Sequence, residues 1–280
     1  MHFDKFILVA CLMTGLTACG GGSSGPPGPI FAGDAPPVGI EDFLGLDFPL
    51  KVAVVDVENG VVNGAVQDVY TLRFNSPSQA VLTSPLGPIT LNEVLGDFEG
   101  TSGDRNTSLT APDGGEYLAL LFVEDGIVST ETGYFGGAIF GLETTLAGIS
   151  TLVDGNAFAS YEGGGLVVIA TGPDIGDIVT VEGTTQLGVA FGSGAVIGSL
   201  IDDGTSVFSL IGGQVSGHGF TGTVQISGDL DTQLSISSSS VSGDFYGGAA
   251  EEIGGTFGGS GTWALGPATF AGVFAGADVP

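Results

Sequence analysis

The chain has 280 residues, 42% of them hydrophobic, which is enough to bury a core and argues against a disordered chain. Four Lys and Arg residues stand against 31 Asp and Glu, so the formal net charge is −27. Such a surface repels nucleic acid phosphates and anionic lipid headgroups, and we therefore expect no nucleic-acid partner. The 52 glycines and the scarcity of Lys, Arg, Met and Gln favour strands joined by tight turns over long surface helices.

Residues 1–18 have the pattern of a lipoprotein signal peptide. A short start containing Lys5 precedes the apolar run FILVACLMTGL, which is too short to cross a membrane as a helix. The run ends in Leu16-Thr17-Ala18-Cys19, which resembles a bacterial lipobox, where cleavage before the cysteine accompanies diacylglyceryl attachment to its sulfur. We expect lipid at Cys19 to anchor the mature protein on a membrane without spanning it.

Residues 19–37 are rich in Gly, Ser and Pro and read as a flexible to extended tether. Gly20 follows the lipidated cysteine in place of an aspartate of the kind that retains lipoproteins in the inner membrane, so we expect the outer membrane. Both cysteines, Cys11 and Cys19, lie in the first nineteen residues, so the folded part has no disulfide available. Apart from the covalent lipid we expect no cofactor.

Residues 38–150 alternate short β-rich runs with turn signals and predict a β-rich subdomain. In VYTLRF the side chains of Tyr70, Leu72 and Phe74 share one face, the period of a half-buried strand. Asn59-Gly60 between VAVVDV and VVNGAV reads as a hairpin with a primed turn, and Asp125-Gly126 after EYLALLFVE reads as a second hairpin.

Residues 151–280 continue the pattern, with a third hairpin at Asp203-Gly204. TVQISG and LSIS are expected to turn Val224, Ile226, Leu234 and Ile236 inward against outward Thr, Gln and Ser. Because those outward residues are polar, a barrel with an anchor fits better than a barrel embedded in lipid. No segment has a sustained 3.6-residue period, so the prediction is an all-β fold with little helix.

From near Leu152 to Ala275 the chain resembles the β-barrel domain of transferrin-binding protein B and related surface lipoproteins. The most specific stretch is GDFYGGAAEEIGGTF, from Gly243 to Phe257. AVIGSLIDDG, GGQVSGHGFTGTV and ATFAGVFAGA resemble successive barrel strands, whereas EYLALLFVEDG and TGYFGGAIFG resemble the smaller β handle of that family. The resemblance implies an antiparallel eight-stranded β-barrel over residues 151–280, preceded by a smaller β-rich handle subdomain over residues 38–150.

The signature also makes physical sense. We expect Phe245 and Tyr246 to fill the barrel interior, and Gly254 and Gly255 to permit a bend or a close approach of backbone. The Glu251 and Glu252 pair could suggest acid–base chemistry or a cation site, but adjacent strand residues point to opposite faces, which favours structural or solvated roles. The signature residues taken as structural are Phe245, Tyr246, Gly247, Glu251, Glu252, Gly254, Gly255 and Phe257.

Enzymatic and metal chemistry have little basis in the sequence. His218 is the only histidine after the leader, and its setting in SGHGFTG favours a turn or a barrel wall over a Ser-His-Asp triad. No Cys or His cluster has zinc spacing, and no EF-hand loop is present. We therefore predict a non-enzyme without a metal site; a hydrolase and weak calcium or iron binding by the acidic surface stay open as alternatives.

The expected function is a surface-exposed, outer-membrane lipoprotein that acts as a binding module for a protein or solute ligand. The resemblance implies a link to iron or nutrient acquisition, with an outer-membrane transporter and a surface-lipoprotein export factor as partners. The chain departs from the family, because transferrin-binding protein B has two such lobes and this chain has one, so transferrin itself is not the expected ligand. The alternative is an adhesive or protective cell-surface scaffold without a specific soluble ligand.

Overall fold

The computed structural model describes residues 44–59, 61–94, 97–114, 118–172, 178–202, 204–226, 233–264 and 266–279. Residues Ala35–Pro280 form one compact unit, which contains every strand given below. The predicted signal peptide at 1–18, the lipid site Cys19 and the tether at 19–37 lie outside the described residues.

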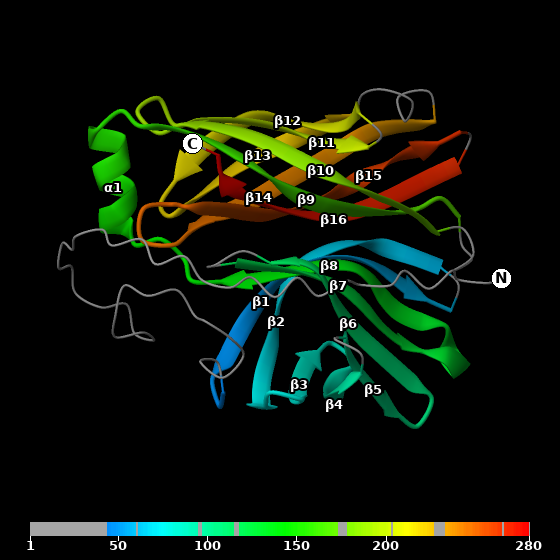
Figure 1. Ribbon diagram of the computed structural model, residues 1–280. Helices are drawn as coiled ribbons and strands as arrows, with labels where there is room; N and C mark the ends of the chain where they lie inside the picture. The colour runs from blue at the N-terminus through cyan, green and yellow to red at the C-terminus, as the bar shows by residue number, and fades with distance from the viewer. Residues whose placement is uncertain are drawn as a thin grey trace. The chain divides into compact units, whose positions relative to one another are not determined.

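The first half of the described chain forms a closed antiparallel barrel (Figure 1). Each strand pairs with the next in sequence, and Lys51–Val57 of the first strand pairs with Gly133–Ile139 of the eighth to close the sheet. Closure satisfies the backbone groups that a sheet edge would leave unpaired. The eight strands are β1 (Asp47–Glu58), β2 (Val61–Ser76), β3 (Gln79–Ser84), β4 (Gly87–Val94), β5 (Asp97–Ser102), β6 (Arg105–Gly114), β7 (Leu118–Ile127) and β8 (Thr132–Gly141).

A second closed antiparallel barrel follows, in which the last strand pairs with the first. Its strands are β9 (Phe158–Ala170), β10 (Ile178–Ala190), β11 (Ala195–Asp202), β12 (Thr205–Ser216), β13 (Gly219–Ile226), β14 (Leu234–Tyr246), β15 (Glu252–Trp263) and β16 (Gly266–Asp278). The all-β fold class with its eight-stranded barrel is thus confirmed. The first half, expected as a smaller handle, forms a closed eight-stranded barrel of its own. Its closure depends on pairing of β1 with β8 across about 80 intervening residues, and local sequence patterns do not indicate pairing at that range.

Two short helical elements interrupt the strands: α1 (Leu146–Asp154) and the 3₁₀ turn η2 (Val128–Thr130). The Thr145 hydroxyl accepts a hydrogen bond from the Gly148 N–H at 3.1 Å and caps α1. Ile149 of α1 packs into the core of the second barrel, so the helix closes one end of that barrel. None of the helices in these ranges is long and apolar enough to cross a membrane.

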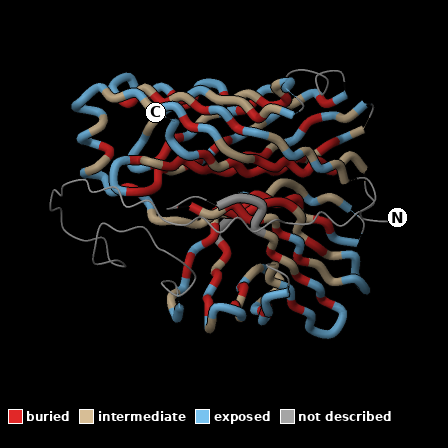
Figure 2. The backbone as a smooth tube through the Cα atoms, viewed as in Figure 1, coloured by how far each residue is buried: buried red, intermediate tan, exposed pale blue. Residues whose placement is uncertain are grey.

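Both barrels place alternate side chains in their interiors, and Figure 2 shows the resulting alternation of buried and exposed backbone. Tyr70, Leu72 and Phe74 are all buried in the first barrel, as predicted. Val224 and Leu234 are buried in the second barrel, and Ile226 and Ile236 pack against the same core, which also confirms their predicted face.

A third apolar cluster joins the outer faces of the two barrels. Its fully buried members come from β1, β7 and β8 on one side and from β9, β14 and β16 on the other: Ala53, Val55, Val57, Leu118, Leu120, Ile139, Leu166, Val168, Ala170, Tyr246, Ala271 and Val273. Glycine lets the strands approach closely, since a Cβ added at Gly137 would lie 2.1 Å from Val273 Cγ2. The apolar run Leu166–Ala170 therefore alternates between the interior of the second barrel and this shared cluster.

Two of the three predicted hairpins form, and the third does not. Asn59, at φ 53°, and Gly204, at φ 76°, each lie between paired antiparallel strands, as expected. The Asp125-Gly126 prediction is wrong, because both residues lie inside β7 and the turn is formed by η2 two residues later. Asp125 is held in the strand by a buried ion pair, an interaction that outweighs its local turn preference.

Candidate functional site

The signature stretch, from Gly243 to Phe257, forms the end of β14, a turn, and the first half of β15. The turn contains two residues with left-handed backbone, Gly247 at φ 85° and Ala250 at φ 59°. Its backbone holds the connection that leaves the first barrel: Thr144 N–H donates to Phe245 O at 2.7 Å, and Gly247 N–H donates to Leu142 O at 2.8 Å. The signature therefore contacts the segment through which the chain leaves the first barrel.

Lys51 ties the two barrels together at the same junction. Its ammonium group, on β1, donates to Glu143 Oε1 at 2.7 Å and to Asp244 Oδ2 on β14. Burial opposes the charge on Lys51, but the hydrogen bonds and negative charges of Asp244 and Glu143 outweigh it and raise the pKa of the ammonium group. The Lys51 ammonium group is thus paired within the protein, at the junction of the two barrels.

Within the signature, neighbouring residues serve opposite faces of the sheet. Phe245 is fully buried in the interior of the second barrel, as expected, whereas Tyr246 lies in the cluster shared with the first barrel. The expectation of an interior Tyr246 is wrong, since side chains alternate across a strand. Burial raises the pKa of the Tyr246 hydroxyl well above its usual value, with the charges of Asp244 and Glu143 adding to the effect.

Gly254 and Gly255 of the signature lie where neighbouring groups leave no room for a Cβ, and its two glutamates have different surroundings. A Cβ at Gly254 would lie 2.7 Å from Leu118 Cδ2 of the first barrel, and one at Gly255 would lie 2.4 Å from the ring of Phe274. Both glycines lie in an unbroken ladder with β14, so they provide close approach without a bend. Glu251 accepts a hydrogen bond from Ala249 N–H at 2.8 Å, and Glu252 is buried at the start of β15.

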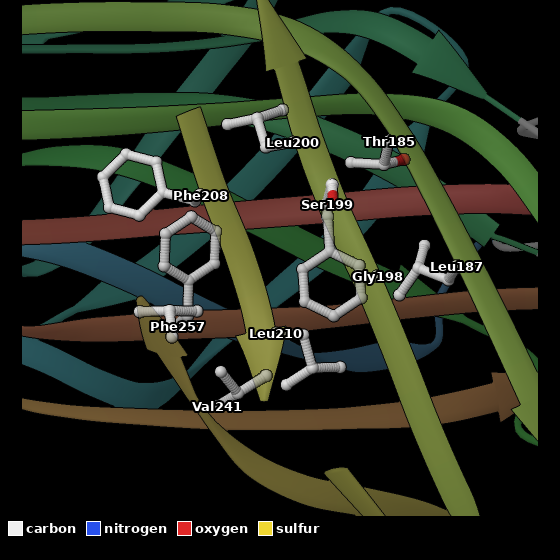
Figure 3. Close-up of a pocket in the computed structure, with 11 residues that line it drawn as sticks. Thr185, Leu187, Gly198, Ser199, Leu200, Phe208, Leu210, Val241 and Phe257 are labelled. Carbon is white, nitrogen blue, oxygen red and sulfur yellow. The ribbon is translucent and has the colours of Figure 1, made fainter. Parts of the chain in front are cut away.

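The interior of the second barrel is filled. Phe257 of the signature belongs to a continuous run of rings with centroids 5.1 to 6.4 Å apart, formed by Phe191, Phe245, Phe220, Phe274, Phe257, Phe208 and Phe270. Beside the rings, a cavity of about 30 Å³ is lined by side chains from β10 to β16 (Figure 3). A single water needs about 10–15 Å³ on this measure, so the cavity has room for about two waters and not for an organic ligand.

The first barrel has a polar cluster among its inward side chains. Asp125 is fully buried and accepts two hydrogen bonds from the Arg105 guanidinium, at 2.9 and 3.0 Å. Thr107 and Ser84 donate to the same carboxylate at 2.6 and 2.5 Å, and the remaining Arg105 nitrogen donates to the carbonyls of Leu86 and Gly87. Sequence reasoning missed this cluster; the only signal was that Arg105 is one of three cations beyond the leader.

Two more titratable groups lie on strands next to this cluster. Tyr134 of β8 is paired with Asp125 on one side and with Asp56 on the other. Burial raises the pKa of Asp56, and the charge of Glu58 adds to this effect, although a hydrogen bond from Asn63 opposes it. Burial also raises the pKa of Tyr134, aided by Asp56 and Asp125.

A groove of about 470 Å³ runs along the outer side of the second barrel where it meets β7 of the first. Its lining combines apolar side chains, glycine backbone and two carboxylates: Leu120, Phe122, Gly164, Gly165, Glu182, Gly183, Thr184, Ile201, Asp202 and Gly204. Such a volume could hold several side chains of an extended segment. Among the features described so far, this groove is the one large enough for a ligand.

The cations of the described residues are all engaged in ion pairs. Lys51 and Arg105 are described above, and Arg73 Nη1 lies 3.6 Å from Asp47 Oδ1. The chain from Asn106 to its end contains no Lys or Arg at all. The outer surface of the second barrel thus offers carboxylates, hydroxyls and apolar groups to a partner, without a cation.

His218 lies exposed in the turn between β12 and β13, one of the two positions that its sequence context favoured. Its backbone carbonyl accepts a hydrogen bond from Phe245 N–H at 3.1 Å. In the part of the chain that the structure covers, no group of three His, Cys, Asp or Glu side chains is arranged to hold a metal ion.

Comparison with known proteins finds relatives of the second barrel. Residues 153–278 match the family model described as the C-lobe and N-lobe beta barrels of Tf-binding protein B, which confirms the resemblance seen in the sequence. A double mutant of transferrin-binding protein B from Haemophilus parasuis Hp5 is similar at a TM-score of 0.56 and 17% identity, over 82% of this chain and 45% of that one. The isotype 1 protein from serogroup B Neisseria meningitidis is similar at a TM-score of 0.54 and 17% identity, over 83% of this chain and 44% of that one.

This likeness extends to the fold of both barrels, but the chain spans less than half the length of these solved structures. No curated protein matches.

Proposed function

We propose that this chain, whose residues 153–278 form a barrel of the transferrin-binding protein B type, is a non-enzymatic binding module that captures a protein ligand on its outer surface. The solved relatives are named for binding transferrin. The proposal for this chain is broader, because it spans less than half of their length. Within it, the ligand is a protein used in iron or nutrient acquisition.

The observation that carries this proposal is the filled interior of the second barrel. With a ring run along the interior and a cavity of only about 30 Å³, the barrel has no lumen for a solute. Binding must then use the outer surface or the 470 Å³ groove, both of which suit a macromolecule or an extended segment of one. A rigid, closed scaffold also lowers the ordering cost of binding, since little of it must be fixed when the ligand docks.

The location that we propose is the outer membrane, with the protein exposed at the cell surface and anchored by lipid at Cys19. The leader, the lipobox and Gly20 support this placement. An outer-membrane transporter and a surface-lipoprotein export factor are the partners that follow from it.

A pull-down tests the function. The fragment that starts at Gly20 is incubated with growth medium and envelope extract, and bound species are identified by mass spectrometry, with heat-unfolded fragment as the control. One dominant partner, displaced by excess free fragment, is the expected result. A folded fragment that retains nothing would instead favour the adhesive or protective scaffold.

The location needs a separate test. Protease added to intact cells should degrade the wild-type protein, and labelled palmitate should be incorporated into it. Cys19→Ser should abolish the label and release the protein from membranes. Protection from protease on intact cells, with lipid incorporation preserved, would place the protein on the periplasmic face and contradict the surface assignment.

A further inference from the structure

Three large apolar side chains lie exposed next to one another on the outer face of the second barrel. Phe158 on β9, Ile197 on β11 and Ile211 on β12 are 69%, 66% and 37% exposed. We call them the apolar row. Exposed apolar residues that occur singly are normal, whereas an exposed aromatic ring among aliphatic neighbours is typical of an interaction surface.

The register of the sheet brings the row together. Gly188 of β10 lies between Phe158 and Ile197, and a methyl group placed there would be 3.6 Å from Phe158 Cζ and 3.6 Å from Ile197 Cγ1. On the other side, Val196 pairs with Gly213 and Gly198 pairs with Leu210, so the bulge at Ile211 and Gly212 lies opposite Ile197. Because Gly188 has no side chain, the Phe158 ring and Ile197 flank a shallow site above it.

Two carboxylates lie on the same face, both toward the same end of the strands from the row, because Glu162 pairs with Gln186 and Glu182 pairs with Leu166. Glu162, four residues along β9 from Phe158, is about 13 Å away at ~3.3 Å per residue, and Glu182 on β10 is about 20 Å from Gly188 by the same count. Both are exposed, and Glu182 also lines the groove next to the first barrel. No Lys or Arg follows Arg105 in the chain, so no cation of this barrel neutralises them.

We propose that the outer face of β9 to β12 is the docking surface for the protein ligand, and that the ligand presents aliphatic or aromatic side chains with Lys or Arg to one side of them. The apolar row supplies the desolvated contact, and Glu162 and Glu182 supply negative charge on one side of it. A second copy of this chain is a poor occupant, because its second barrel offers no Lys or Arg to these carboxylates. The inference rests on the proposed binding function and names the chemical class of the ligand.

The test uses the compact unit Ala35–Pro280, isotope-labelled for NMR, and two end-blocked peptides, Lys-Leu-Trp-Leu-Lys and Glu-Leu-Trp-Leu-Glu. The cationic peptide should shift the amides of Ser160, Gly188, Ile197 and Ile211 in a saturable way, and the anionic peptide should not. Phe158→Ser with Ile197→Thr should weaken binding of the cationic peptide about tenfold, because the centre of an interface carries most of its binding energy.

Two further variants separate the contributions. Glu162→Gln with Glu182→Gln should weaken binding at low salt and flatten its salt dependence, as loss of charges beside an interface does. The matched control, Val61→Thr with Val128→Thr, removes apolar groups that are 55% and 67% exposed on the first barrel and should leave binding unchanged.

Several results would overturn the inference. Equal binding of the anionic peptide would remove the role of the carboxylates. Shifts spread over the whole acidic surface, unchanged in the Phe158→Ser variant, would reduce the effect to nonspecific attraction. Concentration-dependent shifts of the row amides without peptide would assign the face to self-association. A pull-down partner that still binds the Phe158→Ser variant fully would leave the binding function intact and refute this docking surface.

Discussion

The three cationic side chains beyond the leader lie in ion pairs with very different surroundings. Arg105 faces a fully buried Asp125 with two hydrogen bonds, Lys51 is half-buried between two carboxylates, and Arg73 lies on the surface 3.6 Å from Asp47. The free energy of an ion pair depends on what its removal leaves behind: a solvated charge costs little, and an orphaned buried charge costs much.

Arg105→Met should therefore lower the free energy of unfolding by about 3–5 kcal/mol, because it leaves the Asp125 carboxylate buried without a counter-ion. The matched variant Arg73→Met should change it by about 0–1 kcal/mol. Urea denaturation of both variants, with comparable m-values, measures the difference. Equal losses would mean that the Arg105 pair is worth no more than a surface pair.

Asp56→Asn should stabilise the protein at neutral pH. The folded state raises the pKa of Asp56, so its charged form is disfavoured by folding. This penalty is present above the folded pKa and disappears as the pH falls below the unfolded value of about 3.9. The gain in melting temperature of the variant should thus shrink on acidification; a gain that persists at pH 3 would point to a cause other than titration.

At the scale of the strands, glycine decides where two sheets meet. Gly137 of β8 and Gly254 of β15 lie where the other barrel leaves no room for a Cβ, whereas Gly188 has ordinary contact distances. The outcome of each predicted hairpin is also decided at the level of the strands. The hairpins at Asn59 and Gly204 form, because these residues adopt left-handed backbone angles at strand ends. Asp125-Gly126 fails because a buried partner holds Asp125 in β7.

Gly137→Ala should reduce the free energy of unfolding by about 1–3 kcal/mol, the usual range for overpacking a closed core. The new methyl group would meet Val273 Cγ2 at 2.1 Å, so adding Val273→Ala should recover part of the loss. Gly188→Ala, where the contacts are 3.6 Å, serves as the control and should be near neutral. Additive losses in the double variant would show that Val273 is not the limiting contact.

The seam between β13 and β14 offers another prediction. Its backbone ladder covers Gly219–Gly222 and then stops, and the Ser239 hydroxyl instead bonds both the N–H and the C=O of Val224, each at 3.0 Å. Ser239→Ala should cost about 1–3 kcal/mol, because it leaves two half-buried backbone groups unsatisfied. Hydrogen exchange at Val224 should quicken; the exposed Ser237→Ala is the control, and unchanged exchange would argue against the bridge.

For the whole molecule, the charge imbalance acts on stability as well as on binding. A net charge of −27 with three engaged cations beyond the leader means that folding brings like charges together. If the proposed docking surface holds a cationic ligand, the same imbalance contributes to its recognition.

Raising NaCl from about 0.01 M to about 1 M shortens the Debye length from about 30 Å to about 3 Å and should raise the melting temperature. A fall would mean that the ion pairs outweigh the repulsion. Calcium chloride at equal ionic strength distinguishes screening from a specific cation site, since a site would add stability by mass action beyond that of NaCl.

The sequence by itself determined the alternation of faces along the strands, the second barrel, and the turns at Asn59 and Gly204. These features depend on local periodicity and backbone preference, or on a motif contained in one stretch.

Only the tertiary structure decided which apolar face meets which neighbour. The closure of the first barrel, the outward position of Tyr246 and the buried Arg105–Asp125 pair all join residues distant in sequence. So does the apolar row, whose members Phe158 and Ile211 are unremarkable in their own strands and come together through the register of four strands. Pairing between distant strands depends on all contacts in the fold, so it cannot be predicted from the sequence of one segment.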